Sequence, residues 1–141
     1  MTEVLNRQRK VRIDTAGLKD FAVRACETIR EAAGGSATIV MVSDEKIRKL
    51  NAEFRSKDTA TDVLSFPFGE DQEEGMFLGD VVISAESAER QADENGLSLD
   101  TELKQLVLHG ILHLCGYDHE TDEGEMDALE IRYRNKLGIE E

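Results

Sequence analysis

The sequence predicts an α+β fold: a single domain over residues 1–141, with a small mixed β-sheet of about four strands packed with about five helices. Three observations predict this class. The chain is 141 residues long and 40% hydrophobic, which suits one compact unit with one core. Strand patterns come early in the chain and helical patterns come late. We find no internal repeat, low-complexity segment or linker that would divide it.

The N-terminal part of the chain is predicted to form two strands and two helices. Residues 10–14 alternate polar and apolar side chains, as a half-buried strand does, and a helix follows that should end near Gly34 and Gly35. Residues 37–43 are rich in β-branched residues and predict a strand, after which Ser43 can cap a second helix. The predicted buried faces are Leu18, Phe21, Ala22, Ala25 and Ile29 in the first helix, and Ile47, Leu50 and Phe54 in the second.

The rest of the chain is predicted to contribute two strands and three helices. Residues 61–68 are a strand candidate in which Pro67 indicates an edge or a strand end. The acidic residues 69–75 predict a loop, and residues 77–84 predict the next strand. Helices are predicted at 85–95, 98–115 and 121–137, with Gly96 and Gly116 ending the first two.

The charge of the chain is strongly negative, at −13, which normally argues against a polyanionic ligand such as RNA. The charge is uneven, however, because residues 1–57 hold 12 Lys/Arg against 8 Asp/Glu, whereas residues 58–141 hold 5 against 22. Both runs can be solvated faces. If the ligand is an anion, we expect the N-terminal cations to gather near one cleft: Arg7, Arg9, Lys10, Arg12, Lys46, Lys49, Arg55 and Lys57.

The compartment follows from the apolar segments and the cysteines. No apolar run approaches the ~20 residues of a membrane span, and residues 1–10 lack the apolar centre of a secretory signal. We therefore expect a cytoplasmic protein with no membrane partner. Cys26 and Cys115 fall in apolar helical patterns, and two cysteines are too few for a disulfide framework. We expect both to be reduced core residues without a redox role.

All three histidines of the chain, His109, His113 and His119, lie close together in sequence. On an α-helix, residues i and i+4 project from one face, so the first two can direct ring nitrogens at one point. Gly116 can take the left-handed conformation that ends a helix, and the chain can then return so that His119 reaches the same point. Three neutral imidazoles with an open fourth position are typical of a catalytic zinc site.

The alternative interpretation is that the histidines are ordinary polar residues near a helix end. Their spacing around a helix-ending glycine favours a metal site, holding one zinc ion or another divalent transition metal per chain. The helix over 98–115 is apolar nearly all round, so we expect the site on a buried central helix and the turn that follows it. Cys115 should point away from the site and is not expected to be a ligand.

The spacing also matches the zinc-protease motif H-E-x-x-H-x-x-G-x-x-H, in which the glutamate is the general base. Here Gly110 stands in place of that glutamate. A zinc peptidase is therefore disfavoured.

Three blocks of the sequence, residues 50–68, 78–84 and 109–119, resemble the YbeY family of bacterial rRNA-maturation endoribonucleases and occur in the family's order. The resemblance implies a single-strand-specific, metal-dependent endoribonuclease that matures ribosomal RNA, notably the small-subunit 3′ end, and takes part in ribosome quality control. It also implies ribosomal proteins or an assembly GTPase as partners. The alternative is a ribosome-assembly factor that does not catalyse and uses the metal structurally.

Carried over by position, His109, His113 and His119 resemble the family's metal ligands, and Arg55 resembles its active-site arginine. A guanidinium offers paired donors to a phosphodiester, although a solvated arginine at a helix end is the alternative. Residues 59–62 lack the family's usual proline, which concerns only the stiffness of that turn. Lys57 and, more weakly, Ser65 are further candidates for substrate contacts. Asp62 and Asp80 can each be a structural cap or a cleft residue, and Asp118 can be a turn residue or one that orients a ligand imidazole.

Overall fold

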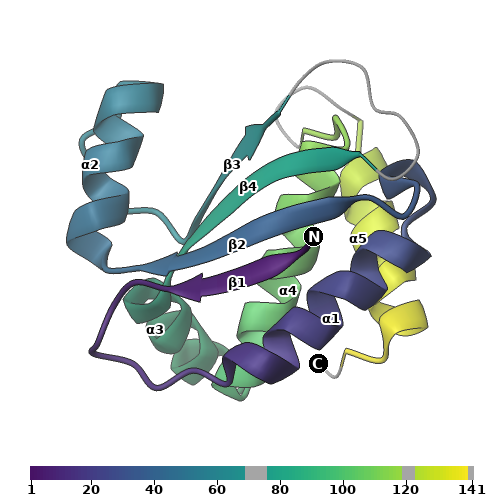
Figure 1. Cartoon of the computed structure of the whole chain (residues 1–141). Helices are drawn as coiled ribbons and strands as arrows, with labels where there is room; N and C mark the ends of the chain where they lie inside the picture. The colour runs from purple at the N-terminus through teal and green to yellow at the C-terminus, as the bar shows by residue number, and fades with distance from the viewer. Residues whose placement is uncertain (69–75, 119–122, 140–141) are drawn as a thin grey trace.

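The computed structural model describes residues 1–68, 76–118 and 123–139 (Figure 1). Within these residues, four strands form one sheet and five α-helices surround it, so the predicted α+β class with a mixed sheet is confirmed. The strands are β1 (Glu3–Asn6), β2 (Ser36–Val42), β3 (Val63–Pro67) and β4 (Phe77–Ser84). The helices are α1 (Thr15–Thr28), α2 (Asp44–Arg55), α3 (Ala85–Asn95), α4 (Leu99–Leu114) and α5 (Glu125–Leu137), with a 3-10 turn at Arg30–Ala32.

The sheet has the order β1-β2-β4-β3. The β1/β2 and β2/β4 pairs are parallel, and β3 runs antiparallel to β4 with Ser65 opposite Val81. Strand β3 is therefore an edge strand, which agrees with the expectation drawn from Pro67, because proline is tolerated at an edge.

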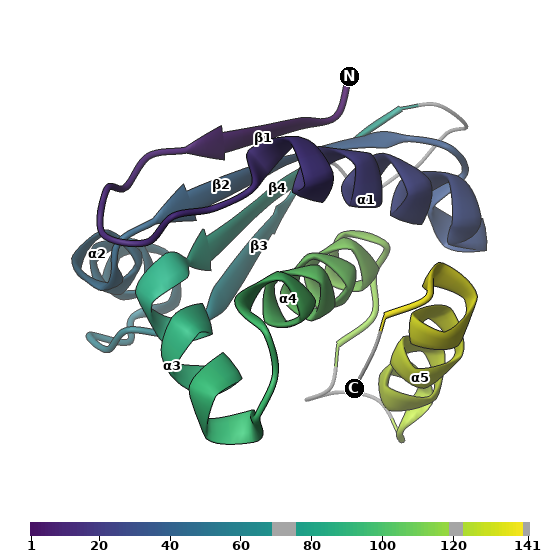
Figure 2. The ribbon, with the colours of Figure 1, turned by 90° about the horizontal axis from the view of Figure 1, so that it is seen from below.

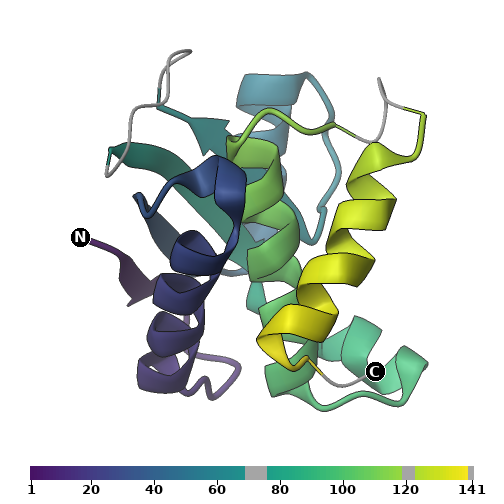
Figure 3. The ribbon, with the colours of Figure 1, turned by 90° about the vertical axis from the view of Figure 1, so that its right-hand side faces the viewer.

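Helices cover the two faces of the sheet unequally. Figure 2 shows α1 and α4 side by side on one face, and Figure 3 shows α4 between α1 and α5. This face holds the main core, and α4 lies within it: Leu106, Val107, Leu108, Ile111 and Leu112 are all buried. On the other face, α2 covers a smaller cluster formed by Val42, Ile47, Leu64 and Val82. The expectation of a buried central helix is confirmed.

The predicted strand over residues 10–14 is wrong, and the first strand is Glu3–Asn6 instead. The alternation arises because Val11 and Ile13 both turn toward the core from an irregular segment. The side chain of Gln8 donates to the Val11 carbonyl at 2.8 Å and accepts from the Val11 N–H at 2.9 Å. A side-chain amide thus takes the place of a strand partner.

Two further boundaries and one buried face differ from the prediction. Helix α1 ends at Thr28, before the 3-10 turn, rather than near Gly34 and Gly35. Helix α5 begins at Glu125 rather than near residue 121. Residue 121 and the predicted loop 69–75 lie outside the described residues. Phe54 was expected on the buried side of α2 but is 60% exposed, whereas Ile47 is fully buried. The ring of Phe54 packs edge-on against Phe66, with centroids 5.3 Å apart, near the outer edge of the sheet.

Gly110 sets how closely α4 approaches the sheet. A Cβ at this position would lie 2.4 Å from Val81 Cγ1 of β4, which is far inside van der Waals contact. We expect Gly110→Ala to destabilise the protein by up to roughly 2 kcal/mol, because overpacking costs about 1–3 kcal/mol and a helix-propensity gain of about 1 kcal/mol offsets only part of it. Urea unfolding of the metal-free protein measures this change in the free energy of unfolding.

A double-mutant cycle identifies the cause. Gly110→Ala should cost less in a Val81→Ala background, where the γ-methyl groups are gone, than in the wild type. Equal costs in the two backgrounds would contradict a clash with Val81.

Candidate metal centre

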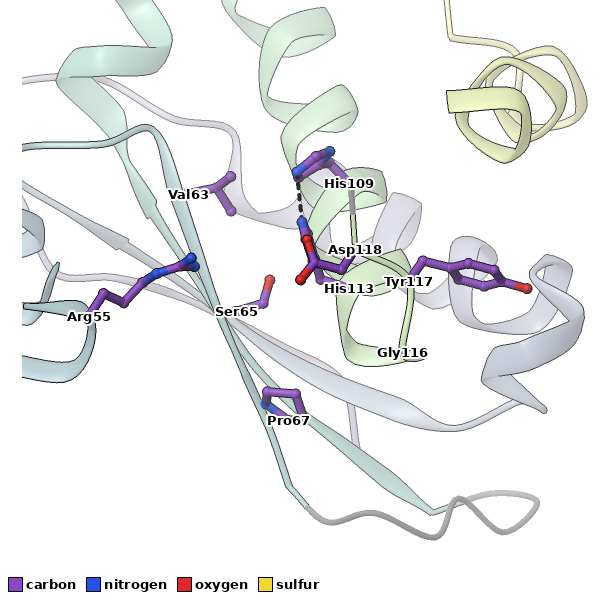
Figure 4. Close-up of a pocket in the computed structure, with 9 residues that line it drawn as sticks. All are labelled: Arg55, Val63, Ser65, Pro67, His109, His113, Gly116, Tyr117 and Asp118. Carbon is purple, nitrogen blue, oxygen red and sulfur yellow. Dashed lines mark hydrogen bonds between the residues drawn. The ribbon is translucent and has the colours of Figure 1, made fainter. Parts of the chain in front are cut away.

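Two histidines of α4 converge on one point (Figure 4). The Nε2 atoms of His109 and His113 lie 3.1 Å apart, and their ring centroids are separated by 4.6 Å. Nitrogen ligands that are each about 2.0–2.1 Å from a shared zinc ion lie within about 4 Å of one another, so this pair fits such an ion. The third predicted ligand, His119, lies outside the described residues.

The turn after α4 has the predicted form. The N–H of Gly116 donates to the His113 carbonyl at 3.0 Å, and the N–H of Tyr117 donates to the Leu112 carbonyl at 3.2 Å. Gly116 has a φ of +99°, in the region that favours glycine, as expected for a helix-ending residue. The turn brings Tyr117 and Asp118 to the same cleft as the histidine pair.

The histidine pair lies in a cleft of about 260 Å³. One wall is formed by alternate residues of β3, which share a face of the strand: Val63, Ser65 and Pro67. Arg55 extends toward the cleft from α2 (Figure 4). A neighbouring recess of about 450 Å³ continues the cleft and adds Lys57 and Asp62 to its lining.

The end of α2 positions the two predicted phosphate contacts. Ser56 adopts a φ of +56°, and the N–H of Lys57 turns back to donate to the Asn51 carbonyl at 3.2 Å. The buried Asn51 side chain donates to the Thr59 carbonyl at 2.9 Å, which ties the following segment to the helix. Arg55 is exposed at the end of α2, as expected for a solvated arginine. It also lines the cleft, as expected for a residue that contacts substrate.

The remaining candidates divide between the cleft and the outer face of the sheet. The Ser65 hydroxyl donates to the Gly110 carbonyl at 3.3 Å, so this side chain joins β3 to α4 while lining the cleft. Asp62 and Asp118 line the cleft or its recess. Asp80 is exposed on β4 next to Val81, which faces α4, so its own side chain projects from the opposite face.

The expectation that eight cations gather near one cleft is wrong. Among the described residues that line the histidine cleft and its recess, only Arg55 and Lys57 belong to that set. Arg7 and Lys46 line a separate groove on the outer face of the sheet, Lys49 borders another, and Lys10 pairs with Glu86 at 3.6 Å. Successive residues of a helix point in different directions, so a basic run in α2 cannot present all its cations to one side.

One contact of the histidine pair was missed in the sequence. Nδ1 of His109 lies 2.5 Å from Oε1 of Glu130 on α5, and Arg134 donates to the other carboxylate oxygen at 3.4 Å. Glu130 falls on the buried face of α5, in register with Met126, Tyr133 and Leu137. The sequence feature that could have revealed Glu130 is a carboxylate at a helical position whose neighbours on the same face are apolar.

The fold and the cleft define a class of protein: small α+β proteins whose buried central helix presents two histidines, one turn apart, to a cleft beside an edge strand. A family model described as Endoribonuclease YbeY matches residues 3–138. The chain belongs to the YbeY family.

Relatives and a solved structure agree with this assignment. An Endoribonuclease YbeY from Koribacter versatilis is 45% identical over 138 residues, covering 96% of this chain and 86% of its own length. One from Carboxydothermus hydrogenoformans is 41% identical and covers 99% of both chains. The solution structure of a Thermotoga maritima protein aligns with a TM-score of 0.65 and 30% identity over 97% of this chain and 89% of its own.

The two thiols are not suited to bind a metal or to react. Burial raises the pKa of Cys26 to about 11 and that of Cys115 to about 12. Because the thiolate is the reactive form, we expect Cys115 in the folded protein to react with iodoacetamide at about pH 8 roughly 10³-fold more slowly than a free cysteine. Mass spectrometry of alkylated peptides measures both rates, with the urea-unfolded chain as the control. Rapid alkylation of the folded protein at Cys115 would contradict this assignment.

Proposed function

We propose that this protein is a metal-dependent endoribonuclease that cleaves single-stranded RNA at the histidine cleft. The observation that carries the proposal is the pair of imidazole nitrogens 3.1 Å apart at a cleft that Arg55 also lines. Nitrogen ligands for a metal and a fixed cation for a phosphodiester are thus combined in one place. The names of the relatives, Endoribonuclease YbeY, support the same activity.

The proposed metal ligands are His109, His113 and His119, which would hold one zinc ion or another divalent transition metal. When bound, the ion supplies Lewis-acid chemistry that activates water or polarises a phosphoryl oxygen.

The protein's own side chains bind and orient the RNA. The Arg55 guanidinium offers fixed paired donors to phosphoryl oxygens and stabilises the negative charge that develops there during cleavage. Lys57, in the adjoining recess, makes a second phosphate contact. Ser65 is a weaker substrate contact, since its oxygen keeps acceptor capacity while its proton goes to the Gly110 carbonyl.

The cellular role is proposed from the family. Relatives carry the name Endoribonuclease YbeY, and the resemblance implies maturation of the small-subunit rRNA 3′ end and ribosome quality control in the cytoplasm. Ribosomal proteins or an assembly GTPase are the proposed partners. No helix among the described residues is long and apolar enough to cross a membrane.

The packing of Gly110 disfavours a peptidase. The side-chain direction at position 110 faces Val81 of the sheet at 2.4 Å, so a glutamate there would have no room and would not reach the cleft. The position of the catalytic carboxylate in the zinc-protease motif is thus occupied by a glycine, and Val81 leaves no space there for a side chain.

We expect Arg55→Ala to lower cleavage of single-stranded rRNA at least about 100-fold while bound metal stays unchanged, because the lost donors act on phosphoryl charge rather than on the ion. Initial rates are measured with the metal-loaded protein, and metal content is measured by atomic emission. The matched control is Arg48→Ala in the same helix, since Arg48 is paired with Asp58 at 2.9 Å and lies outside the cleft lining. Loss of metal together with activity in Arg55→Ala would contradict this role.

His113→Ala and a chelator test the metal in the same assay. Both should abolish cleavage, and a His113→Ala variant that still supports rRNA maturation in cells would favour the assembly-factor alternative. The product ends identify the nucleophile, because a 2′,3′-cyclic phosphate requires attack by the RNA's own 2′-hydroxyl.

The small number of cations in the cleft predicts a weak salt dependence. With phosphate contacts from Arg55 and Lys57 alone, the logarithm of the binding constant for single-stranded RNA should fall with the logarithm of salt concentration with a slope of about −1.4. Fluorescence anisotropy at several salt concentrations measures the slope. A slope steeper than about −4 would require a larger basic surface elsewhere.

A further inference from the structure

We propose that Glu130 is a positioning residue that sets the orientation and the tautomer of His109. In this tautomer Nε2 of His109, the nitrogen that would face the metal, is unprotonated, and its lone pair points toward the side of His113. The inference rests on the proposed metal-dependent function and names a part of its machinery on α5, which supplies none of the proposed ligands. Glu130 acts through His109 and is not itself a ligand or a catalytic residue.

The tautomer follows from the hydrogen bond. A neutral imidazole has one N–H donor and one acceptor nitrogen, and an ionised carboxylate only accepts. Because Nδ1 of His109 lies 2.5 Å from Glu130 Oε1, the proton belongs on Nδ1. Nε2 is then unprotonated, and this is the nitrogen that lies 3.1 Å from His113 Nε2. The ring is thereby prepared for metal binding before any ion arrives.

The burial of Glu130 distinguishes it from a surface ion pair. Its side chain is only 11% exposed, on the same face of α5 as the buried Met126 and Tyr133. A buried carboxylate is unfavourable unless it is paired and hydrogen-bonded, and an apolar residue would serve packing alone at least as well. The position therefore points to a role for the carboxylate itself.

Arg134 completes the arrangement from one turn further along α5. It donates to Oε2 of Glu130 at 3.4 Å, so the two carboxylate oxygens face different partners. A small recess beside His109 is lined by Glu130, Arg134, Glu102, Gln105 and Asp62, and Arg55 is not among its described lining residues. His109 is thus held from behind through Nδ1 while Nε2 faces the cleft.

The test compares Glu130→Gln with Glu102→Gln. Both replace a buried carboxylate with an amide of the same size near His109, but the carboxylate bonded to the ring is lost only in Glu130→Gln. We expect the zinc affinity, measured by competition with a chromogenic chelator, to fall about 10–100-fold in Glu130→Gln and to stay within about twofold of wild type in Glu102→Gln. Arg134→Gln, which leaves the His109 contact in place, should give a smaller loss.

A second measurement needs neither metal nor activity. In the metal-free protein, long-range ¹H–¹⁵N spectra of the histidine rings should show His109 protonated on Nδ1, and Glu130→Gln should show a mixture of tautomers. Circular dichroism and urea unfolding establish that each variant is folded. If Glu130→Gln does not fold, the tautomer of His109 in the wild-type protein and the zinc affinity of Arg134→Gln still test the proposal. A wild-type His109 protonated on Nε2 overturns it.

The outcomes separate this inference from the proposed function. Unchanged zinc affinity and tautomer in a folded Glu130→Gln, with only lower stability, would show a structural ion pair and overturn the positioning role. Weakened zinc binding in Glu130→Gln, with wild-type protein that cleaves no RNA, would uphold the positioning role and refute the endoribonuclease.

Discussion

The close approach of α4 to the sheet at Gly110 is the constraint on which the candidate site depends. The absence of a side chain allows the helix backbone to lie directly over Val81 of β4. At that distance the Ser65 hydroxyl of β3 reaches the Gly110 carbonyl at 3.3 Å, which links the edge strand to the helix. The cleft is the space left between these elements, and His109 and His113 border it because they flank this contact on α4.

The same contact explains how a sequence with protease-like histidine spacing can carry different chemistry. In the zinc-protease motif, the residue after the first histidine supplies the general base. Here that direction is filled by the sheet, so any further functional group must come from another element. Arg55 comes from the end of α2, and Glu130 comes from α5. Both lie far from His109 in sequence: Arg55 lines the cleft, and Glu130 contacts Nδ1 of His109.

Local features of the sequence predicted much of the fold and part of the site. Ser43 caps α2 through the Lys46 N–H, Gly116 takes a positive φ, and the histidine pair converges, because each depends on contacts within a few residues. Features that depend on distant contacts were missed. Glu130 meets His109 from 21 residues away. The strand predicted over residues 10–14 failed for a local reason, because the side chain of Gln8, three residues before Val11, bonds the Val11 backbone. Hydrophobic periodicity carries no information about such partners.

The distribution of charge constrains how this acidic protein engages RNA under the proposed function. Its N-terminal cations are spread over several surfaces, and Arg55 and Lys57 face a cleft that also contains Asp62 and Asp118. Affinity from phosphate neutralisation is therefore limited to a few contacts. Under the proposed function, selectivity must then come from shape: we expect a cleft between an edge strand and a helix to admit an extended single strand more readily than an A-form duplex, whose bases are paired and whose width is fixed. The proposed preference for single strands would thus depend on the same helix-to-sheet packing that brings the histidines together.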